Sequence, residues 1–456
     1  MYDAVSIEER NKPVVALANK DFVNDAMSAA SSRLMPTVRI VPTSVPCECS
    51  VMEQVESGID AAMVNIVAAL TRPLTAEEAS PQPKELEKPS GVIFKGDLDD
   101  VNRFFYKRGW TDGLPIIPPT EEKVAEMLTG TDLPPDYLVA EMVPRRGKAT
   151  IERIAINAVM AGCLPTYMPV LIAGVQALTD PRWDPSVSTV STGSWAPFWI
   201  INGPIRHALH INSGWGALSP GDIANAAIGR AMSLITKNIR GVRKAVEDMG
   251  CLGNACKYSQ VIAENEEGSP WEPLHVEQGF KKEDSAVTVF FPNSSSQMWA
   301  YGSDDEGILR TVIYNLIPGR RGRFCLVLTP PHAKILASKG WTKKDIKAFI
   351  ADYGRVPAYR MPGYWRVNQG EPAGLYKDRI PMNNTDAVSV LNDPRLIKVL
   401  VAGGDGAIVG QFVGAYPDHL AVEADAMWIT RKAELPANWD KLVQKYKDIV
   451  PTYVRY

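Results

Sequence analysis

Short apolar runs and apolar residues at helical spacing follow one another from the start of the chain. Val14–Ala18 and Val38–Val41 have the length and composition of short strands. One face of a predicted amphipathic helix is then formed by Ile59, Met63, Ile66, Val67 and Leu70. Because two strands and their helices cannot cover both faces of a parallel sheet, we expect residues 1–72 to form a partial α/β domain that needs further strands.

The apolar periodicity stops at Pro73. From there to Pro89 the chain is rich in proline, glutamate and lysine, a composition typical of an extended linker, which we place at residues 73–92. Residues 93–456 are predicted to form a helix-rich main catalytic domain. For this domain we leave open a division into two lobes near residue 300.

The main domain is predicted to contain both helices and buried strands. Ser219 as N-cap, Pro220 as first helical residue and Asp222 in the first turn predict a helix over Ile223–Ile239. A second helix, capped by Thr342 and Asp345, should run to about Tyr353. Buried strands are predicted at Val287–Phe291, Phe324–Leu328 and Leu396–Ala402. The expected class is α/β, or α+β if the helices segregate, and no repeat of solenoid period is detected.

One stretch could be mistaken for a membrane span. Ile154–Leu178 carries no charged residue, but polar residues, glycine and proline interrupt it. A buried helical hairpin that turns at Cys163-Leu164-Pro165 fits this pattern better than a span, which needs about 20 consecutive apolar residues.

Composition narrows the class of function. Of 456 residues, 45% are hydrophobic and 22% charged, as in globular proteins and unlike disordered chains. Lys+Arg 49 against Asp+Glu 52 gives a net charge of −3, too balanced to predict a nucleic-acid or anionic-membrane partner. Six cysteines are too few for a disulfide scaffold, and no signal-peptide pattern opens the chain. We therefore expect a cytoplasmic protein.

The turn Gly109–Pro115 is the first candidate for chemistry. It would hold the Asp112 carboxylate and the Thr111 hydroxyl at fixed angles beside Trp110, an arrangement suited to orienting a substrate. The alternative is an ordinary turn in which Asp112 caps its own backbone.

A second candidate lies around Asn202-Gly203-Pro204 and Asn212-Ser213-Gly214. Glycines beside the helix that begins near Pro220 would let backbone N–H groups bind a carboxylate or phosphate. The alternative is a tight connection packed under the core. His207 and His210 have no third metal ligand nearby in sequence, so we expect them to be structural.

The richest segment runs from Cys251 to His275. If Gln260–Ala263 is a strand, Glu264 and Glu266 point to the same face, where two carboxylates would raise one pKa and form an acid–base pair. His275 would complete either a general acid–base set or a mixed oxygen and nitrogen metal site. Trp271 and the prolines around it imply a rigid, partly buried loop, whereas the alternative is a solvated turn with a buried histidine.

The thiols give weaker signals. Cys251 and Cys256 have neither a redox nor a zinc spacing, and Cys47-Glu48-Cys49 could present one reactive thiolate. Burial in the neutral form is the default for each.

Several of these motifs together resemble the UGSC (seleno)protein family over roughly residues 95–290. They are Gly109–Pro115, Ala155–Cys163, Asn202–Pro204, Asn212–Gly214, Gly229–Ala231, Lys257-Tyr258-Ser259, Ala263–Glu267 and Ser269–His275. The first 72 residues are similar to the latter half of the small α/β domain that gives the family its name, whose opening loop carries Cys/Sec-Gly-Ser-Cys. This chain contains no Cys-Gly-Ser-Cys. The resemblance implies that the thiol chemistry is lost, or that a separate small UGSC-type subunit supplies the redox loop and the missing strands. We favour the second.

The leading hypothesis is a subunit of a cytoplasmic enzyme complex, of oxidoreductase type, that acts on a small polar or anionic molecule by thiol- or selenol-linked redox chemistry. Its predicted catalytic residues are Glu264, Glu266, His275, Asp112, Cys251 and Cys256. Its predicted substrate-binding residues are Trp110, Thr111, Asn202, Asn212, Ser213, Gly214, Tyr258 and Trp271.

Two alternatives remain. A lyase or hydrolase would use a divalent metal held by Glu264, Glu266, Glu272 and His275. A non-catalytic scaffold would bind a ligand and activate a partner subunit. The expected partners are a small molecule and other chains in an oligomer, with no nucleic acid and no membrane.

Overall fold

The computed structural model describes residues 1–45, 52–80, 91–182, 185–316, 323–360, 366–367, 371–372, 386–391, 393–414 and 428–449. Helices and mixed sheets make up this part of the chain, which agrees with the predicted α/β or α+β class. Cys47 and Cys49 lie outside the described residues.

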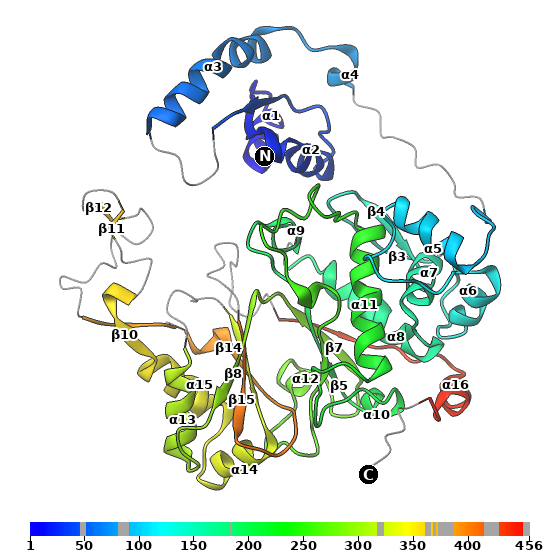
Figure 1. Cartoon of the computed structure of the whole chain (residues 1–456), viewed down its shortest axis with the longest axis vertical. Coiled ribbons are helices and arrows are strands. Elements are labelled where there is room, and N and C mark those ends of the chain that lie inside the picture. Colours follow the sequence, from blue (N-terminus) through cyan, green and yellow to red (C-terminus); the bar gives the residue numbers. More distant parts are fainter. Residues whose placement is uncertain are drawn as a thin grey trace.

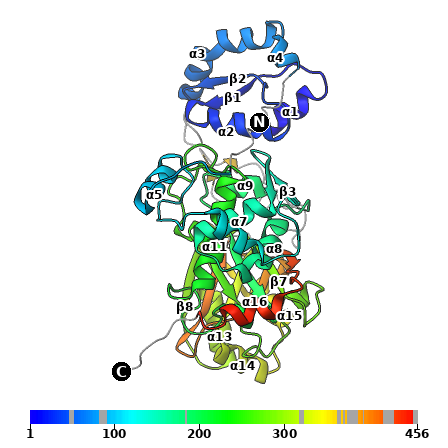
Figure 2. The same cartoon turned by 90° about the vertical axis from the view of Figure 1, so that its right-hand side faces the viewer.

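The N-terminal unit contains the two predicted strands. β1 (Ala16–Asn19) and β2 (Ile40–Thr43) pair in parallel as a two-stranded sheet. Figure 2 shows them between α3 (Met52–Thr71) on one side and α2 (Val23–Ser32) on the other, with α1 (Tyr2–Glu8) beside α2. The sheet therefore has no more strands here than the sequence predicts.

Helix α3 packs against β2 through its small residues. Gly58 and Ala62 are buried, whereas Met63 and Val67 on the predicted apolar face are 43% and 50% exposed. Small residues allow close contact with β2, so the large apolar side chains are left outside the unit.

The N-terminal unit extends into the predicted linker. A capping box between Thr75 and Glu78 begins the short helix α4 (Ala76–Ala79). Glu78 also pairs with Arg39, which directly precedes β2, at 3.1 Å. The described unit therefore reaches Ser80 rather than ending at residue 72, and residues 81–90 of the predicted linker lie outside the described ranges.

The predicted helical hairpin is present in the main domain. α7 (Ile151–Ala161) ends at Gly162, whose φ of 86° lies in the left-handed region that glycine adopts without strain. A short turn leads into α8 (Met168–Leu178), which is almost wholly buried. Among the described residues, no helix combines the length and apolar character needed to cross a membrane.

The main domain contains two four-stranded sheets, the first of which packs on this hairpin. The first has the order β16-β7-β5-β6, from Ile429–Lys432, Ala286–Phe290, Phe198–Asn202 and Val261–Ala263. The second has the order β14-β9-β15-β8, from Ile397–Val401, Phe324–Leu328, Ile408–Gly414 and Ser294–Trp299.

The main domain has four layers (Figure 1). One face of the first sheet packs on α7, α8 and α11 (Ile223–Asn238). One face of the second packs on α13 (Asp305–Tyr314), α14 (Pro330–Ser338) and α15 (Lys343–Tyr353). The other faces meet in a third core, where Phe198, Ile200 and Trp428 contact residues such as Val327 and Leu400. The alternation of side chains along each strand places successive residues in different cores.

The two sheets share one pattern of connections. Each sheet takes three strands from one half of the domain: β5, β6 and β7 in the first sheet, and β9, β14 and β15 in the second. The earliest of the three pairs in parallel with the second of them and antiparallel with the third. The fourth strand comes from the other half, because β8 follows β7 but joins β15, and β16 follows β15 but joins β7. The two halves of the main domain are therefore interleaved by exchanged edge strands.

The remaining elements are shorter or peripheral. They are α5 (Leu98–Lys107), α6 (Glu121–Leu128), β3 (Leu138–Met142), β4 (Gly147–Thr150), α9 (Pro185–Val190), α10 (Ile205–Ala208), α12 (Leu274–Glu277), β10 (Arg355–Pro357), β11 (Arg366–Val367), β12 (Glu371–Pro372), β13 (Ala387–Ser389), α16 (Trp439–Tyr446) and the 3-10 turns η1 (Lys20–Phe22), η2 (Pro165–Tyr167), η3 (Ala255–Lys257), η4 (Ala358–Arg360) and η7 (Pro394–Leu396).

Candidate functional site

Polar residues meet where β5 and β6 end. These strands are parallel neighbours, so Asn202 at the end of β5 lies beside Glu264, which directly follows β6. Asn202 Nδ2 donates to Glu264 Oε2 at 2.7 Å, and the Leu274 backbone N–H donates to the same oxygen at 2.8 Å. Asn202, Glu264 and Leu274 are all fully buried. Glu264 is thus held inside the protein, at the strand ends where ligands commonly bind in α/β proteins.

A lysine from the other half of the domain reaches this carboxyl. Lys343, the first residue of α15, places its Nζ 3.6 Å from Glu264 Oε1. The same Nζ donates to the Glu272 carbonyl at 2.6 Å and pairs with the Glu277 carboxylate, which also accepts from Lys347 at 3.1 Å. Lys343 therefore joins two carboxylates, one buried in the core and one at its edge.

The two carboxylates are shifted in opposite directions. Burial raises the pKa of Glu264, although the nearby Lys343 ammonium and two hydrogen bonds oppose the shift. Burial acts in the same way on Glu277, but Lys343 and Lys347 outweigh it and hold the pKa of Glu277 below its usual value. Two nearby acids whose pKa values are pushed apart are a common basis for acid–base catalysis.

Three buried polar atoms near these strand ends have no hydrogen-bond partner within the described chain. They are Asn202 Oδ1, Glu264 Oε1 and His275 Nδ1. Since most buried polar atoms in proteins are hydrogen-bonded, each of these atoms needs an explanation, and a role in catalysis is one that their shared location favours. His275 lies on α12 with its Nε2 3.4 Å from the Lys282 carbonyl oxygen.

Glu266 is not the partner that the sequence predicts for Glu264. The strand ends at Ala263, and the chain turns so that Glu266 N–H donates to the Glu264 carbonyl. Arg206 Nε lies 3.0 Å from Glu266 Oε1, which also accepts from the Gly203 backbone N–H at 2.7 Å. The two carboxylates still meet through Asn202, which donates to Glu266 at 3.1 Å. The raised pKa of Glu264 comes chiefly from burial, with repulsion by Glu266 a smaller cause.

Arg206 also binds the next acid along the chain. The Arg206 guanidinium is 3% exposed and donates to Glu267 at 2.9 Å. The hydrogen bond from Arg206 is the main cause that lowers the pKa of Glu267 to about 2; burial opposes it, and a hydrogen bond from His207 adds a smaller lowering. Arg206 therefore favours the ionised form of Glu267.

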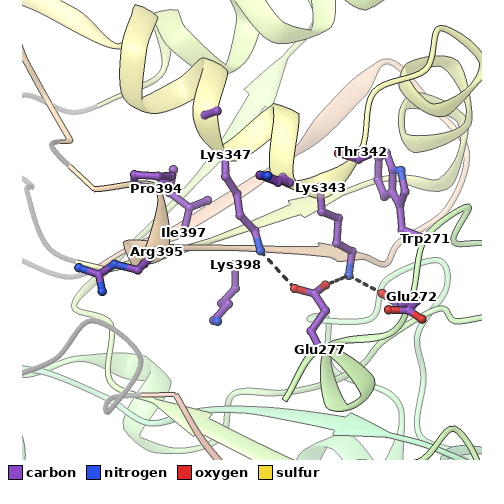
Figure 3. A pocket seen from close by; sticks show the side chains of 12 residues that line it. Trp271, Glu272, Glu277, Thr342, Lys343, Lys347, Pro394, Arg395, Ile397 and Lys398 are labelled. Atoms are coloured by element: carbon purple, nitrogen blue, oxygen red, sulfur yellow. Dashed lines mark hydrogen bonds and ion pairs between the residues drawn. The ribbon is translucent and has the colours of Figure 1, made fainter. Parts of the chain in front are cut away.

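A pocket of about 690 Å³ opens beside Lys343 (Figure 3). Its walls come from α15, η7, the start of β14 and the loop before α12. The lining residues are Trp271, Glu272, Glu277, Thr342, Lys343, Lys344, Lys347, Ala348, Pro394, Arg395, Ile397 and Lys398. Of the predicted site residues, Trp271 and Glu272 lie in this wall. Its volume is typical of small-molecule sites.

The turn around Trp110 has a different role. Asp112 forms a bidentate ion pair with Arg230 of α11, at 2.7 and 3.0 Å. The Thr111 carbonyl accepts from Lys237 at 2.6 Å, and Trp110 packs edge-on against Phe104 and Phe105. Among the described residues, no hydrogen bond, ion pair or ring contact joins this turn to the segment from Glu264 to His275. The predicted meeting of these two segments is not observed, because the turn docks on α11 instead.

The predicted anion site before α11 is also filled by the protein itself. Gly221 has a φ of 139°, which is outside the helical range, so the helix begins at Ile223 with Asp222 as N-cap rather than with Ser219. Asn212 Nδ2 donates to the Asp222 carboxylate at 2.9 Å. The Gly214 N–H donates to the Asn212 side chain and the Ser213 carbonyl accepts from Gly403. A second anion at this helix end would meet the charge of Asp222.

The described thiols do not form a thiolate centre. Burial raises the pKa of Cys163, Cys256 and Cys325. Cys251 is exposed, and Tyr258 nearby is 49% exposed and does not line the pocket. Since the thiolate is the reactive form, a raised pKa argues against the predicted catalytic role of Cys256.

The predicted metal ligands do not converge. No grouping of three or more histidine, cysteine, aspartate or glutamate side chains suited to a metal ion occurs in the described ranges. The physical reason is that other groups engage the donors: Asn202 and an amide bind Glu264, Arg206 binds Glu266, and the carbonyl of Lys282 contacts His275. Glu272 presents its backbone carbonyl, not its carboxylate, to Lys343.

Two lysines of the site, Lys343 and Lys398, were not predicted from the sequence. Lys343 and Lys398 are each 7% exposed, although lysine is seldom buried. Lys398 carried a usable signal, because it is the only charged residue within the apolar run Ile397–Val401. For Lys343 the sequence gives no such signal, because the residue only follows the predicted helix cap Thr342.

Comparison with known proteins gives no relative: no protein family, no curated protein and no solved structure matches this chain.

Proposed function

We propose that this chain is a subunit of an enzyme that acts on a small polar or anionic molecule, and that Lys343 and Glu264 handle a proton in the reaction. The observation that carries the proposal is the 3.6 Å contact between a lysine in a pocket wall and a fully buried carboxyl. The resemblance to the UGSC family and the interleaved halves are compatible with it, but neither is needed for it.

The chemistry follows from the order of the groups. Lys343 lines the pocket, and Glu264 lies behind it with a raised pKa, which favours its protonated form. A proton leaves Lys343 Nζ for the bound molecule, and the proton of Glu264 replaces it, leaving Glu264 as a carboxylate until the reverse transfer. Glu277 remains ionised because Lys343 and Lys347 lower its pKa, so it stabilises the lysines without taking the proton.

A thiol or selenol step requires a group from elsewhere. The buried thiols of this chain have raised pKa values, so we assign such a step to a separate small subunit. The two-stranded β1–β2 sheet and the exposed apolar face of α3 support a partner at the N-terminal unit. The redox form of the proposal depends on that partner, whereas the proton-handling form does not.

The test is turnover by the native complex purified through a tag on the full chain. The complex is incubated with a mixture of small carboxylates and phosphate esters, and their loss is followed by mass spectrometry. We expect consumption of at least one compound, reduced at least about 100-fold in Glu264→Gln and unchanged in the control Glu306→Gln on the exposed surface of α13. No consumption by the wild-type complex, or equal consumption by Glu264→Gln, would overturn the proposal, and the second result would favour a binding scaffold.

A further inference from the structure

We infer that the pocket binds an oxyanion, a carboxylate or phosphate group of the small molecule, through Lys347 and Lys398. This inference rests on the proposed function for the identity of the pocket, but it makes a separate claim about which residues hold the ligand. None of the residues that the sequence analysis selected for an anion lies at this place.

The charge of the pocket wall supports an anionic ligand. Five lining residues are cationic (Lys343, Lys344, Lys347, Arg395 and Lys398) and two are acidic (Glu272 and Glu277). Lys343 donates to the Glu272 carbonyl and the Glu277 carboxylate, and its Nζ lies 3.6 Å from Glu264 Oε1. We therefore assign Lys343 to the proton transfer and not to the binding of the oxyanion. Lys347 donates once, to Glu277 at 3.1 Å, and an ammonium has three N–H groups.

Lys398 is placed where packing alone would favour an apolar residue. It is the second residue of β14, a strand that is buried along its whole length, and it is 7% exposed. Its register partner on β9 is Cys325, which faces the core between the two sheets. Lys398 already has an interaction within the protein, and its place in the pocket wall is the observation that assigns it to a ligand. In Figure 3, Lys398 lies between Arg395 and Glu277 at the pocket.

The other walls describe the rest of the ligand. Trp271, Ala348, Pro394 and Ile397 are apolar, and Trp271 is fixed by a hydrogen bond from its indole Nε1 to the Trp341 carbonyl at 2.9 Å. The first turn of the 11-residue helix α15 also borders the pocket, through Lys343 and Lys344. The ligand class that fits is a small molecule with an apolar or planar body and a carboxylate or phosphate group.

The test is isothermal titration calorimetry on the full chain with four probes: inorganic phosphate, citrate, benzoate and phenyl phosphate, at constant ionic strength. We expect the aromatic probes to bind more tightly than inorganic phosphate, because only they contact Trp271. A preference for benzoate or for phenyl phosphate identifies the carboxylate or the phosphate as the natural group. Lys347→Met and Lys398→Met should each weaken binding at least about tenfold, whereas Lys334→Met, an exposed lysine of α14, should leave it unchanged.

The outcomes separate this inference from the proposed function. If no probe binds, or if Lys398→Met and Lys347→Met bind as well as Lys334→Met, the inference is overturned. Should Lys398→Met fail to fold, Lys347→Met decides alone, because its side chain lies on a helix surface. Glu264→Gln is expected to keep probe affinity within about threefold while losing turnover. Unchanged turnover in Glu264→Gln together with lost binding in Lys398→Met would reject the proton-handling role and retain the anion site.

Discussion

Glu264 and Lys343 lie 3.6 Å apart, although they belong to different halves of the domain. Glu264 follows the edge strand β6 of the first sheet, and Lys343 begins a helix that covers the second. The contact therefore exists only when the two sheets are packed together. Any ligand that changes the charge at Lys343 acts on a junction between the halves.

Replacing Glu264 by glutamine should change how stability depends on pH. Burial raises the pKa of Glu264 in the folded state, so its contribution to stability is fully present below its unfolded pKa near 4.5 and is lost as pH rises through the folded value. The wild type should therefore lose stability relative to Glu264→Gln as pH increases from 4.5. Thermal unfolding of both proteins across pH 4–9 measures this difference. If the stability of the wild type relative to Glu264→Gln stays constant or increases with pH, the raised pKa of Glu264 is contradicted.

Removing the Arg206 guanidinium should be strongly destabilising. Arg206→Met would leave Glu266, whose side chain is 8% exposed, without its cationic partner, and breaking a buried pair in this way costs about 3–5 kcal/mol. The pKa of Glu267 should also rise from about 2, because Arg206 is the main cause of its low value. Chemical denaturation and NMR titration measure the two effects.

A matched control for Arg206 is available on the surface. Arg310 of α13 pairs with Glu306 while 59% exposed, and Arg310→Met should change the free energy of unfolding by no more than about 0.5 kcal/mol. Equal losses in both variants would show that burial of the Arg206 pair does not determine its contribution.

The turn at Asp112 should matter for stability and not for ligand binding. Burial opposes ionisation of Asp112, but the hydrogen bonds and charge of Arg230 outweigh it and lower the pKa. The pair therefore stabilises the fold above pH 3.8, and its contribution is lost as pH falls below that value. Asp112→Ala should reduce the free energy of unfolding by about 1.5–3 kcal/mol at pH 7, with probe affinity unchanged. If Asp112→Ala loses binding of the calorimetric probes but keeps its stability, the turn belongs to the ligand site.

The exposed face of α3 predicts association. Met63, Val67 and Leu70 are each at least 40% exposed on one side of this helix, so the full chain purified without partners should self-associate. Replacing all three by serine should lower the mass measured by light scattering, while Glu53→Ser on the same helix should not. A wild-type chain that is monomeric, with a sharp thermal transition, would contradict the predicted need for a partner.

Local patterns in the sequence predicted local structure well. The strand Phe324–Leu328 and the helix that ends at Tyr353 were predicted at their observed ends, the latter because Thr342 and Asp345 form a capping box. The buried hairpin was predicted because polar residues, glycine and proline interrupt the uncharged stretch Ile154–Leu178. The helix predicted over Ile223–Ile239 is observed as α11 within one residue, but its predicted N-cap was wrong. The backbone at Gly221 is incompatible with a helix, so Asp222 is the N-cap in place of Ser219.

The exchange of edge strands could not be predicted in the same way. β8 and β16 have ordinary strand sequences, and nothing in them indicates which sheet they join. The site residues divide in the same way into those that the sequence could predict and those that it could not. Glu264, Asn202 and Trp271 were predicted as site residues because they belong to motifs in one half of the domain. Lys343 and Lys398 come from the other half and reach the pocket only through the packing of the two sheets.

The most direct measurement is a crystal structure of the full chain with phenyl phosphate or benzoate bound. The account predicts the oxyanion within hydrogen-bonding distance of Lys347 and Lys398, the ring against Trp271, and Lys343 still in contact with Glu264. A ligand bound elsewhere, with this pocket unchanged, would contradict it.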